Sequence, residues 1–169
     1  GQTYKRFCIV TPDGKGAYYD KRHLFTYAGE GEYITPGNSR KVVVFRGVRI
    51  MLQVCYDLRF PVFVRNRDDY DMIIYVASWP IARKIAWNTL IRARAIENQC
   101  YVAAVNRVGV DQFGVYSGDS VLISPYGENV VVAEESKVDM VSAELDMDKL
   151  NHFREKFPVL DDADTYMYM

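Results

Sequence analysis

The sequence predicts a single domain of the α+β class, and three observations support this fold. The chain of 169 residues is 49% hydrophobic, which is enough for one compact core. Strand-like hairpins occur near the beginning and near the end of the sequence, and strand–helix–strand patterns fill residues 50–106. Hairpin strands are antiparallel, whereas strand–helix–strand units are parallel. We therefore expect a mixed sheet packed against helices rather than a doubly wound fold.

Two hairpins are expected in the first third of the chain. The turn sequence "TPDGKG" separates the strand-like stretches 4–10 and 17–25, and Pro-Asp-Gly is strong turn chemistry. The stretch 26–40 is rich in glycine and polar residues, which indicates a loop of functional length. A tight Arg46-Gly47 turn then divides "KVVVFRGVRIMLQVC" into two further strands.

The middle of the chain alternates helices with buried strands. A short helix is expected in "FPVFVRNRDD", and the apolar run "YDMIIYVAS" is typical of a strand buried on both faces. Pro80 opens the longest expected helix, over about 81–98, with Trp87 on its apolar stripe and Arg83 and Arg94 on its polar surface. "CYVAAVN" predicts another buried strand over 100–106.

The last third is expected to contain a loop, a hairpin, a strand and a helix. A glycine-bearing loop over 109–118 leads into "SVLISPYGENVVVAEE", a hairpin that turns at 125–128. "VDMVSAEL" predicts a further strand and "DMDKLNHFREKFP" a final helix. The tail "VLDDADTYMYM" carries little internal pattern.

Composition and charge exclude several classes of protein. The net charge is −1 with both signs interspersed, so the sequence indicates neither a nucleic-acid partner nor a membrane surface. No stretch approaches the ~20 apolar residues of a membrane span. Three widely spaced cysteines argue against a disulfide framework and for a reducing, cytoplasmic compartment. Two histidines leave little material for a metal site, and we expect neither a metal nor a cofactor.

Cys55, in "IMLQVCYDLRFP", lies where a strand turns toward a helix. A lone cysteine at a strand end is most often a small buried hydrophobic residue. Here, however, the next backbone N–H, that of Tyr56, is placed to bind an oxyanion, and the helix end lowers a thiol pKa. Arg59, one turn further on, is able to bind a carboxylate with two hydrogen bonds. Cys8 and Cys100 lie in mid-strand and are expected in the core.

A cysteine nucleophile needs a base, and the segment "YDKRHLF" offers two arrangements. His23 is a candidate for a Cys–His pair, and Lys21 is a candidate to stabilise a tetrahedral intermediate beside a carboxylate base. The plain alternatives are a solvated lysine at a strand edge and a hydrogen-bonded structural histidine. The residues alone leave this choice open.

Five motifs in a fixed order give the sequence a resemblance to a known family. They are "YDKRHLF", "E-x-x-Y-x-x-PG", "VCYDLRFP", "WP" after a buried strand, and "RARAIENQ". Together they resemble the carbon–nitrogen hydrolase (nitrilase) superfamily, most closely its omega-amidase branch, over nearly the whole chain. The resemblance implies a nitrilase-type α-β-β-α sandwich, of which this chain matches the C-terminal two-thirds, with the N-terminal part missing.

The resemblance also implies a Glu–Lys–Cys triad. Cys55 matches the nucleophile, which attacks an amide carbonyl to form a thioester and releases ammonia. Lys21 matches the oxyanion-stabilising lysine, acting together with the Tyr56 backbone N–H. Glu30 matches a second glutamate that orients the lysine or the substrate, and Glu32 ranks below it.

Three further residues receive expected roles from the same resemblance. Arg59 falls where amidases with carboxylate-bearing substrates bind that carboxylate; a salt bridge to Asp57 is the alternative. The side chains of Trp79 and Tyr56 are expected to line the pocket, with an ordinary core position as the alternative. Glu97 is expected to anchor the long helix through an arginine rather than to take part in chemistry.

The chain departs from the family pattern in one respect. The general-base glutamate of the triad lies on a strand well upstream of the lysine, and no position here matches it. We therefore expect this chain to be inactive, or nearly so, and to expose apolar sheet edges. The predicted function is hydrolysis of a small carboxylate-bearing amide by a homodimer without cofactor. The alternatives are a non-catalytic scaffold and a Cys–His hydrolase that uses His23.

Overall fold

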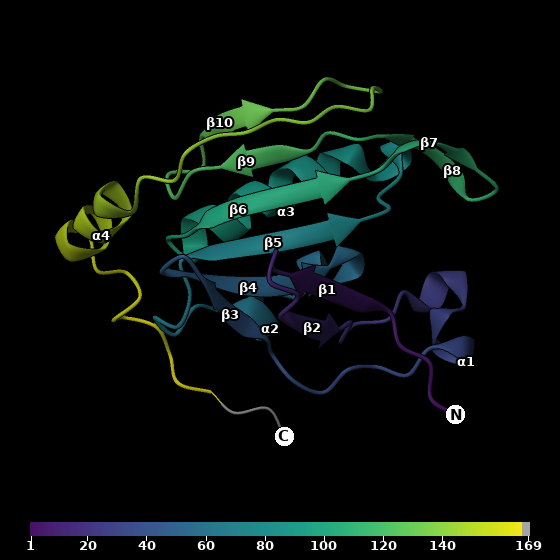
Figure 1. Ribbon diagram of the computed structural model, residues 1–169, viewed down its shortest axis with the longest axis horizontal. Helices are drawn as coiled ribbons and strands as arrows, with labels where there is room; N and C mark the ends of the chain where they lie inside the picture. The colour runs from purple at the N-terminus through teal and green to yellow at the C-terminus, as the bar shows by residue number, and fades with distance from the viewer. Residues whose placement is uncertain (167–169) are drawn as a thin grey trace.

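The computed structural model describes residues 1–166 and has a mixed α/β fold (Figure 1). Its main element is a six-stranded sheet with the order β10-β9-β6-β5-β4-β3, and β1-β2 and β7-β8 form two separate hairpin sheets. The strands are β1 (Arg6–Val10), β2 (Gly16–Asp20), β3 (Val42–Phe45), β4 (Val48–Val54), β5 (Met72–Ala77), β6 (Tyr101–Asn106), β7 (Val108–Asp111), β8 (Gly114–Ser117), β9 (Val121–Ile123) and β10 (Asn129–Val132).

The helices are short, apart from two. The α-helices are α1 (Glu30–Tyr33), α2 (Pro61–Val64), α3 (Lys84–Glu97) and α4 (Met147–Lys156), and the 3-10 helices are η1 (Thr26–Ala28), η2 (Cys55–Arg59) and η3 (Ile81–Arg83). In Figure 1, α2 and α3 lie behind the large sheet, and the hairpin β1-β2 lies in front of β4. Within residues 1–166, no helix has both the length and the apolar character that a membrane crossing requires.

Strands β4, β5 and β6 form the parallel centre of the large sheet. Their side chains include the most deeply buried ones of the core, such as Leu52, Ile73 and Val102 at 0% exposure. α3 covers this centre through Trp87 and Ile91, as its apolar stripe predicts. Because the three strands run in the same direction, their carboxyl ends meet at one edge of the sheet.

Arg94 on α3 is buried rather than part of the polar surface, which corrects the prediction for this residue. Its guanidinium donates to the Leu58 carbonyl oxygen at 2.6 Å and to Glu97 Oε1 at 2.8 Å. Glu97 thus anchors the helix through an arginine, as predicted. The arginine in turn fixes η2, the turn that follows β4.

The hairpin β1-β2 forms as the turn sequence predicts, but one residue on it was misplaced. Phe7 and Ile9 pack on the core, whereas Cys8 between them is exposed. Alternate residues of a strand point to opposite faces, and among the described residues only one face of this hairpin packs on the core. The core position expected for Cys8 is therefore wrong, while that for Cys100 is confirmed, with 0% exposure.

Two expectations for the last third were also wrong. Residues 109–118 form most of the hairpin β7-β8 rather than a loop, with Asp111 paired to Gly114 across the turn. The segment 138–145 is not a strand. Its apolar residues Val138 and Met140 are 92% and 93% exposed, and the segment is not hydrogen-bonded into any of the described sheets. The other predicted hairpins, strands and helices occur at their expected places, although β2 ends at Asp20.

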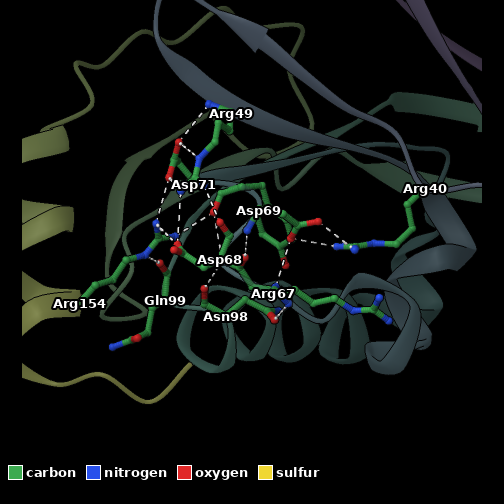
Figure 2. Close-up of polar contacts among 11 residues, drawn as sticks. Arg40, Arg49, Arg67, Asp68, Asp69, Asp71, Asn98, Gln99 and Arg154 are labelled. Carbon is green, nitrogen blue, oxygen red and sulfur yellow. Dashed lines mark hydrogen bonds and ion pairs between the residues drawn. The ribbon is translucent and has the colours of Figure 1, made fainter. Parts of the chain in front are cut away.

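A network of ion pairs joins α4 to the amino ends of β4 and β5 (Figure 2). Asp71, just before β5, accepts hydrogen bonds from Arg49 Nη2 at 2.7 Å and from Arg154 Nη1 at 2.9 Å. Arg154 also donates to the Tyr70 carbonyl oxygen at 2.8 Å. This network lies at the opposite end of the parallel strands from Cys55.

Candidate active site

A cavity of about 780 Å³ opens at the carboxyl ends of β4 and β5. It brings together all six predicted site residues: Cys55, Lys21, Glu30, Tyr56, Arg59 and Trp79. The rest of its lining consists of Lys5, Phe25, Tyr27, Ala28, Val54, Val76, Ala77, Ser78, Pro80, Arg83, Asp111, Phe113 and Tyr116. Crevices at the carboxyl ends of parallel strands are the usual binding places of such sheets.

Cys55 occupies the sharp turn between β4 and η2. Its φ of 47° lies in the left-handed region, which is strained for a residue with a side chain. The thiol donates to the Ser78 carbonyl oxygen, with 3.8 Å between the heavy atoms. Burial raises the pKa of the Cys55 thiol, and the positive charge of Lys21 offsets part of this rise. The thiol is therefore mostly protonated at neutral pH.

Asp57, two residues after the cysteine, fixes the shape of this turn. Its fully buried carboxylate accepts hydrogen bonds from the Tyr19 hydroxyl at 2.9 Å and from the Val54 backbone N–H at 3.2 Å. The backbone N–H of His23 donates to the same carboxylate at 2.9 Å. The ring nitrogen Nδ1 of His23 also contacts this carboxylate, so four hydrogen-bonding groups converge on Asp57. These bonds hold β2 and the Cys55 turn together.

Lys21 is buried, with 2% exposure, directly after β2. Its backbone N–H donates to the Lys5 carbonyl oxygen, and its own carbonyl oxygen accepts from the Gly37 N–H, both at 2.8 Å. A Cβ at position 37 would lie 2.1 Å from the Asp20 carbonyl oxygen, so only glycine allows this approach. Gly37, the glycine of the "PG" in the motif, therefore allows the hydrogen bond that holds the Lys21 backbone in place.

Glu30 binds the Lys21 ammonium at 2.6 Å through Oε2 and the Lys5 ammonium at 2.5 Å through Oε1. The Phe25 backbone N–H also donates to Oε2, at 2.8 Å. Burial disfavours the carboxylate, but these hydrogen bonds outweigh it and hold the pKa of Glu30 below its usual range. Glu32 is exposed and does not line the cavity, in agreement with its lower rank.

Two aromatic residues form cavity walls that are also part of the packing. Tyr56 packs against Phe25 and Phe60, with ring centroids 4.9 and 5.2 Å apart. Trp79 is 4% exposed, and its indole N–H donates to the Arg83 carbonyl oxygen at 2.8 Å. Trp79 therefore both lines the cavity and packs in the core, so the two positions considered for it are not alternatives.

Arg59 reaches over the Trp79 ring, with its guanidinium carbon 5.1 Å from the ring centroid. The salt bridge to Asp57 considered as the alternative does not form, since that carboxylate is taken by Tyr19, Val54 and His23. No residue in the described part of the chain forms an ion pair with Arg59.

His23 lies outside the cavity lining. Its ring stacks on Phe60 at a centroid distance of 3.9 Å, and Nδ1 lies 2.8 Å from Asp57 Oδ1. This is the arrangement of a structural histidine, which disfavours a Cys–His pair. Residues 1–166 contain no group of three or more His, Cys, Asp or Glu side chains that could hold a metal ion.

Three site residues were not found from the sequence. Lys5 lies one pair beyond the β1-β2 ladder, opposite Lys21, so the hairpin register was a usable signal. Asn106, at the end of β6, binds the Trp79 backbone through its side-chain oxygen at 2.7 Å and its amide nitrogen at 2.9 Å. Arg83 was expected only to supply polar surface to the long helix.

A strained cysteine after a parallel strand, a buried lysine and a glutamate that holds the lysine form a site of the class that is built around a cysteine thiol. Comparison with known proteins agrees with this class. Residues 1–155 match the carbon–nitrogen hydrolase family. The chain belongs to the carbon–nitrogen hydrolase family, as the five motifs indicated.

The similar proteins include omega-amidases. The chain is 51% identical to "Omega-amidase YafV" of Yersinia enterocolitica, over 97% of this chain and 64% of the relative. It is 36% identical to a 2-oxoglutaramate amidase of Bacillus subtilis, over 89% of this chain and 58% of the relative. The chain thus spans less than two-thirds of the length of these relatives.

A solved structure shows the same fold. It is that of XC1258 from Xanthomonas campestris, a CN-hydrolase superfamily protein with an arsenic adduct in its active site. The TM-score is 0.94 at 44% identity, over 98% of this chain and 66% of that one. This likeness confirms the nitrilase-type fold. That an N-terminal part of the domain is missing here stays a prediction.

Proposed function

We propose that these residues carry the nucleophilic half of an amidase that hydrolyses a small carboxylate-bearing amide of the omega-amidase type. The observation that carries the proposal is the cavity itself, where the Cys55 thiol and the Lys21–Glu30 pair lie beside an arginine without a carboxylate partner in residues 1–166. The names of the similar omega-amidases and of the 2-oxoglutaramate amidase support this substrate class.

The reaction has two halves. The Cys55 thiol gives up its proton, its sulfur forms a bond to the amide carbon, and the carbonyl electron pair moves to the oxygen. When the tetrahedral intermediate collapses, the C–N bond breaks and the nitrogen takes up the proton that the thiol lost. Ammonia is released, and the acyl group stays on Cys55 as a thioester. Water then attacks the thioester carbon, the C–S bond breaks, and the acid and the free thiol are released.

Lys21 and the Tyr56 backbone N–H are proposed to bind the oxygen on which negative charge develops. The Lys21 ammonium is buried and fixed by Glu30, so it needs little rearrangement during the reaction. Losing one such donor typically lowers the rate by about 10²–10³. Glu30 is proposed to orient the lysine rather than to act as base, because its low pKa makes it a poor proton acceptor.

No carboxylate in the described part of the cavity is free to act as general base. Besides Glu30, the lining carboxylate is Asp111, which is bound by Arg107 at 2.7 Å and by the Phe113 backbone N–H at 2.8 Å. We therefore propose that this chain alone turns amides over very slowly, as expected from the sequence. Ammonia release from an ω-amide at the rate of a complete amidase would contradict this.

An activated ester tests the nucleophile without needing the base. The mono-4-nitrophenyl ester of glutaric acid has a good leaving group and the proposed carboxylate. Mass spectrometry of the intact chain and of its peptides should find a glutaryl group on Cys55 before any on the exposed Cys8, because the cavity is proposed to hold the ester beside Cys55. The Cys55→Ala variant should lose it, and the matched Cys8→Ala variant should keep it. Acylation confined to other residues would overturn the proposed function.

Homodimer formation and a cytoplasmic location stay predictions. The aromatic tail "DTYMYM" is a candidate for the dimer contact, and it lies partly outside the described residues, which end at 166. The scaffold alternative is tested by the same ester, because a scaffold has no reason to acylate Cys55 selectively.

A further inference from the structure

The cavity contains more positive charge than its own carboxylates neutralise. The charged lining side chains are four cations and two carboxylates: Lys5, Lys21, Arg59 and Arg83 against Glu30 and Asp111. Both lysines share Glu30, and Asp111 is bound by Arg107, which is not part of the lining. Arg59 and Arg83 are thus left, among residues 1–166, without a carboxylate partner.

Arg83 crosses from one wall of the cavity toward the other. It follows β5 on the short helix η3, yet its guanidinium carbon lies 5.2 Å from the centroid of the Phe25 ring. The Phe25 backbone N–H binds Glu30, so Phe25 belongs to the wall that holds the two lysines. The Arg83 guanidinium therefore lies over the cavity rather than along α3.

The position of Arg83 in the chain is unfavourable for a positive charge. Arg83 directly precedes α3, a helix of 14 residues whose amino end carries a partial positive charge. The neighbouring Lys84 is compensated by Asp119 and Glu135, each at 2.7 Å. Arg83 has no such compensation in the described structure. An anion in the cavity would supply it, and would also face the amino end of the helix.

We infer that Arg83 is a second carboxylate-binding residue, which acts with Arg59 on the end of the substrate remote from the amide. The inference rests on the proposed function and deepens it, since it makes the negative charge of the substrate the main determinant of binding. Trp79 links the two arginines: its ring lies under the Arg59 guanidinium, and its indole N–H donates to the Arg83 carbonyl oxygen. A guanidinium matches a carboxylate with two parallel hydrogen bonds.

Protection of Cys55 from iodoacetamide tests this without requiring turnover. Peptide mapping follows alkylation of the Cys55 peptide at increasing concentrations of glutarate, or of the neutral butyramide. In Arg83→Gln, the glutarate concentration for half-protection should rise about 10- to 100-fold, as for loss of a hydrogen bond to a charged group. Half-protection by butyramide should not change. Arg83→Lys keeps the positive charge but loses the guanidinium, which is able to form two parallel hydrogen bonds. Its glutarate concentration for half-protection should lie between those of the parent chain and Arg83→Gln.

Arg46→Gln is the matched control, because Arg46 lies in the β3-β4 turn and is not part of the cavity lining. Its half-protection values should equal those of the parent chain. The inference is overturned if glutarate protects the parent no better than butyramide does, or if Arg83→Gln leaves the glutarate value unchanged. Selective acylation of Cys55 by the ester would still stand in either case, so the two proposals fail separately.

Discussion

Lys5 and Lys21 lie opposite each other at the end of the first hairpin, and both ammonium groups bind the same carboxylate. The Lys21 backbone N–H donates to the Lys5 carbonyl oxygen at 2.8 Å, one pair beyond the β1-β2 ladder. Like charges directly opposite in a hairpin repel each other. Glu30 offsets this repulsion by accepting from Lys21 at 2.6 Å and from Lys5 at 2.5 Å. The β1-β2 hairpin thus brings two ammonium groups, with the carboxylate that they share, into the cavity that contains Cys55.

Removal of the Lys21 charge should make Cys55 less reactive. The positive charge of Lys21 is the largest effect that stabilises the thiolate, and Lys5 has a smaller effect of the same sign. Lys21→Met should raise the pKa of Cys55 and slow its alkylation several-fold at pH 8, measured on the Cys55 peptide. Lys5→Met should slow it less, and Lys15→Met, in the exposed turn, should not change it. Equal effects of Lys21→Met and Lys15→Met would contradict this account of the thiol.

The three cysteines should differ in their order of alkylation. Cys8 is exposed, burial raises the pKa of Cys55, and burial raises that of Cys100 still further. At pH 7 Cys8 should therefore react first, Cys55 next, and Cys100 only when the chain unfolds. A time course of peptide alkylation checks this order, and early modification of Cys100 would be inconsistent with the fold.

Glu30 should contribute to stability except in acid. Its pKa is lower when the chain is folded, so its contribution is present above the unfolded pKa, near 4.5, and is lost as the pH falls through the folded pKa. Glu30→Gln leaves the buried Lys21 without a carboxylate and should lower the free energy of unfolding by about 3 kcal/mol at pH 7.

The pH dependence separates Glu30 from other carboxylates. Urea unfolding at pH 7 and at pH 3 should show a smaller difference between the parent chain and Glu30→Gln in acid. Glu32→Gln is the control, because Glu32 is exposed and has no ion pair in the described residues. If Glu30→Gln lowers the free energy of unfolding by the same amount at both pH values, the ion pairs of Glu30 are not the cause of the loss.

The sequence predicted the parts of the site that local pattern determines. A strand followed by a proline-started helix placed Cys55 at a turn, and the ordered motifs identified Lys21 and Glu30. Lys5 and Arg83 were missed because their roles depend on contacts between distant segments. Arg83 in particular resembles an ordinary polar residue at the start of a helix.

The errors in the fold have a similar cause. Alternation alone cannot tell whether both faces of a hairpin are covered, so Cys8 was placed in the core. Strand-like composition does not by itself make a segment such as 138–145 join a sheet, because β-propensity depends on the packing around it. The glycines of 109–118 suggested a loop, but Gly109 and Gly114 adopt φ values of 117° and 144° within the hairpin β7-β8.

Asp71 should be the most important charged residue at the end of the sheet that lies opposite the cavity. It is 4% exposed and binds Arg49 and Arg154, which come from β4 and α4 (Figure 2). Burial opposes its charge, but hydrogen bonds from Arg49 hold its pKa below the usual range. Asp71→Asn should lower the free energy of unfolding by about 3 kcal/mol at pH 7, measured by urea denaturation.

Asp68, three residues earlier, provides the matched control for Asp71. Its side chain is 74% exposed and lies 3.5 Å from Arg49 and 3.8 Å from Arg154. Asparagine tolerates the left-handed φ of 54° at this position. Asp68→Asn should therefore change the free energy of unfolding by less than about 1 kcal/mol. If the two substitutions cost the same, the network stabilises α4 through net charge alone, and the buried geometry of Asp71 has no special role.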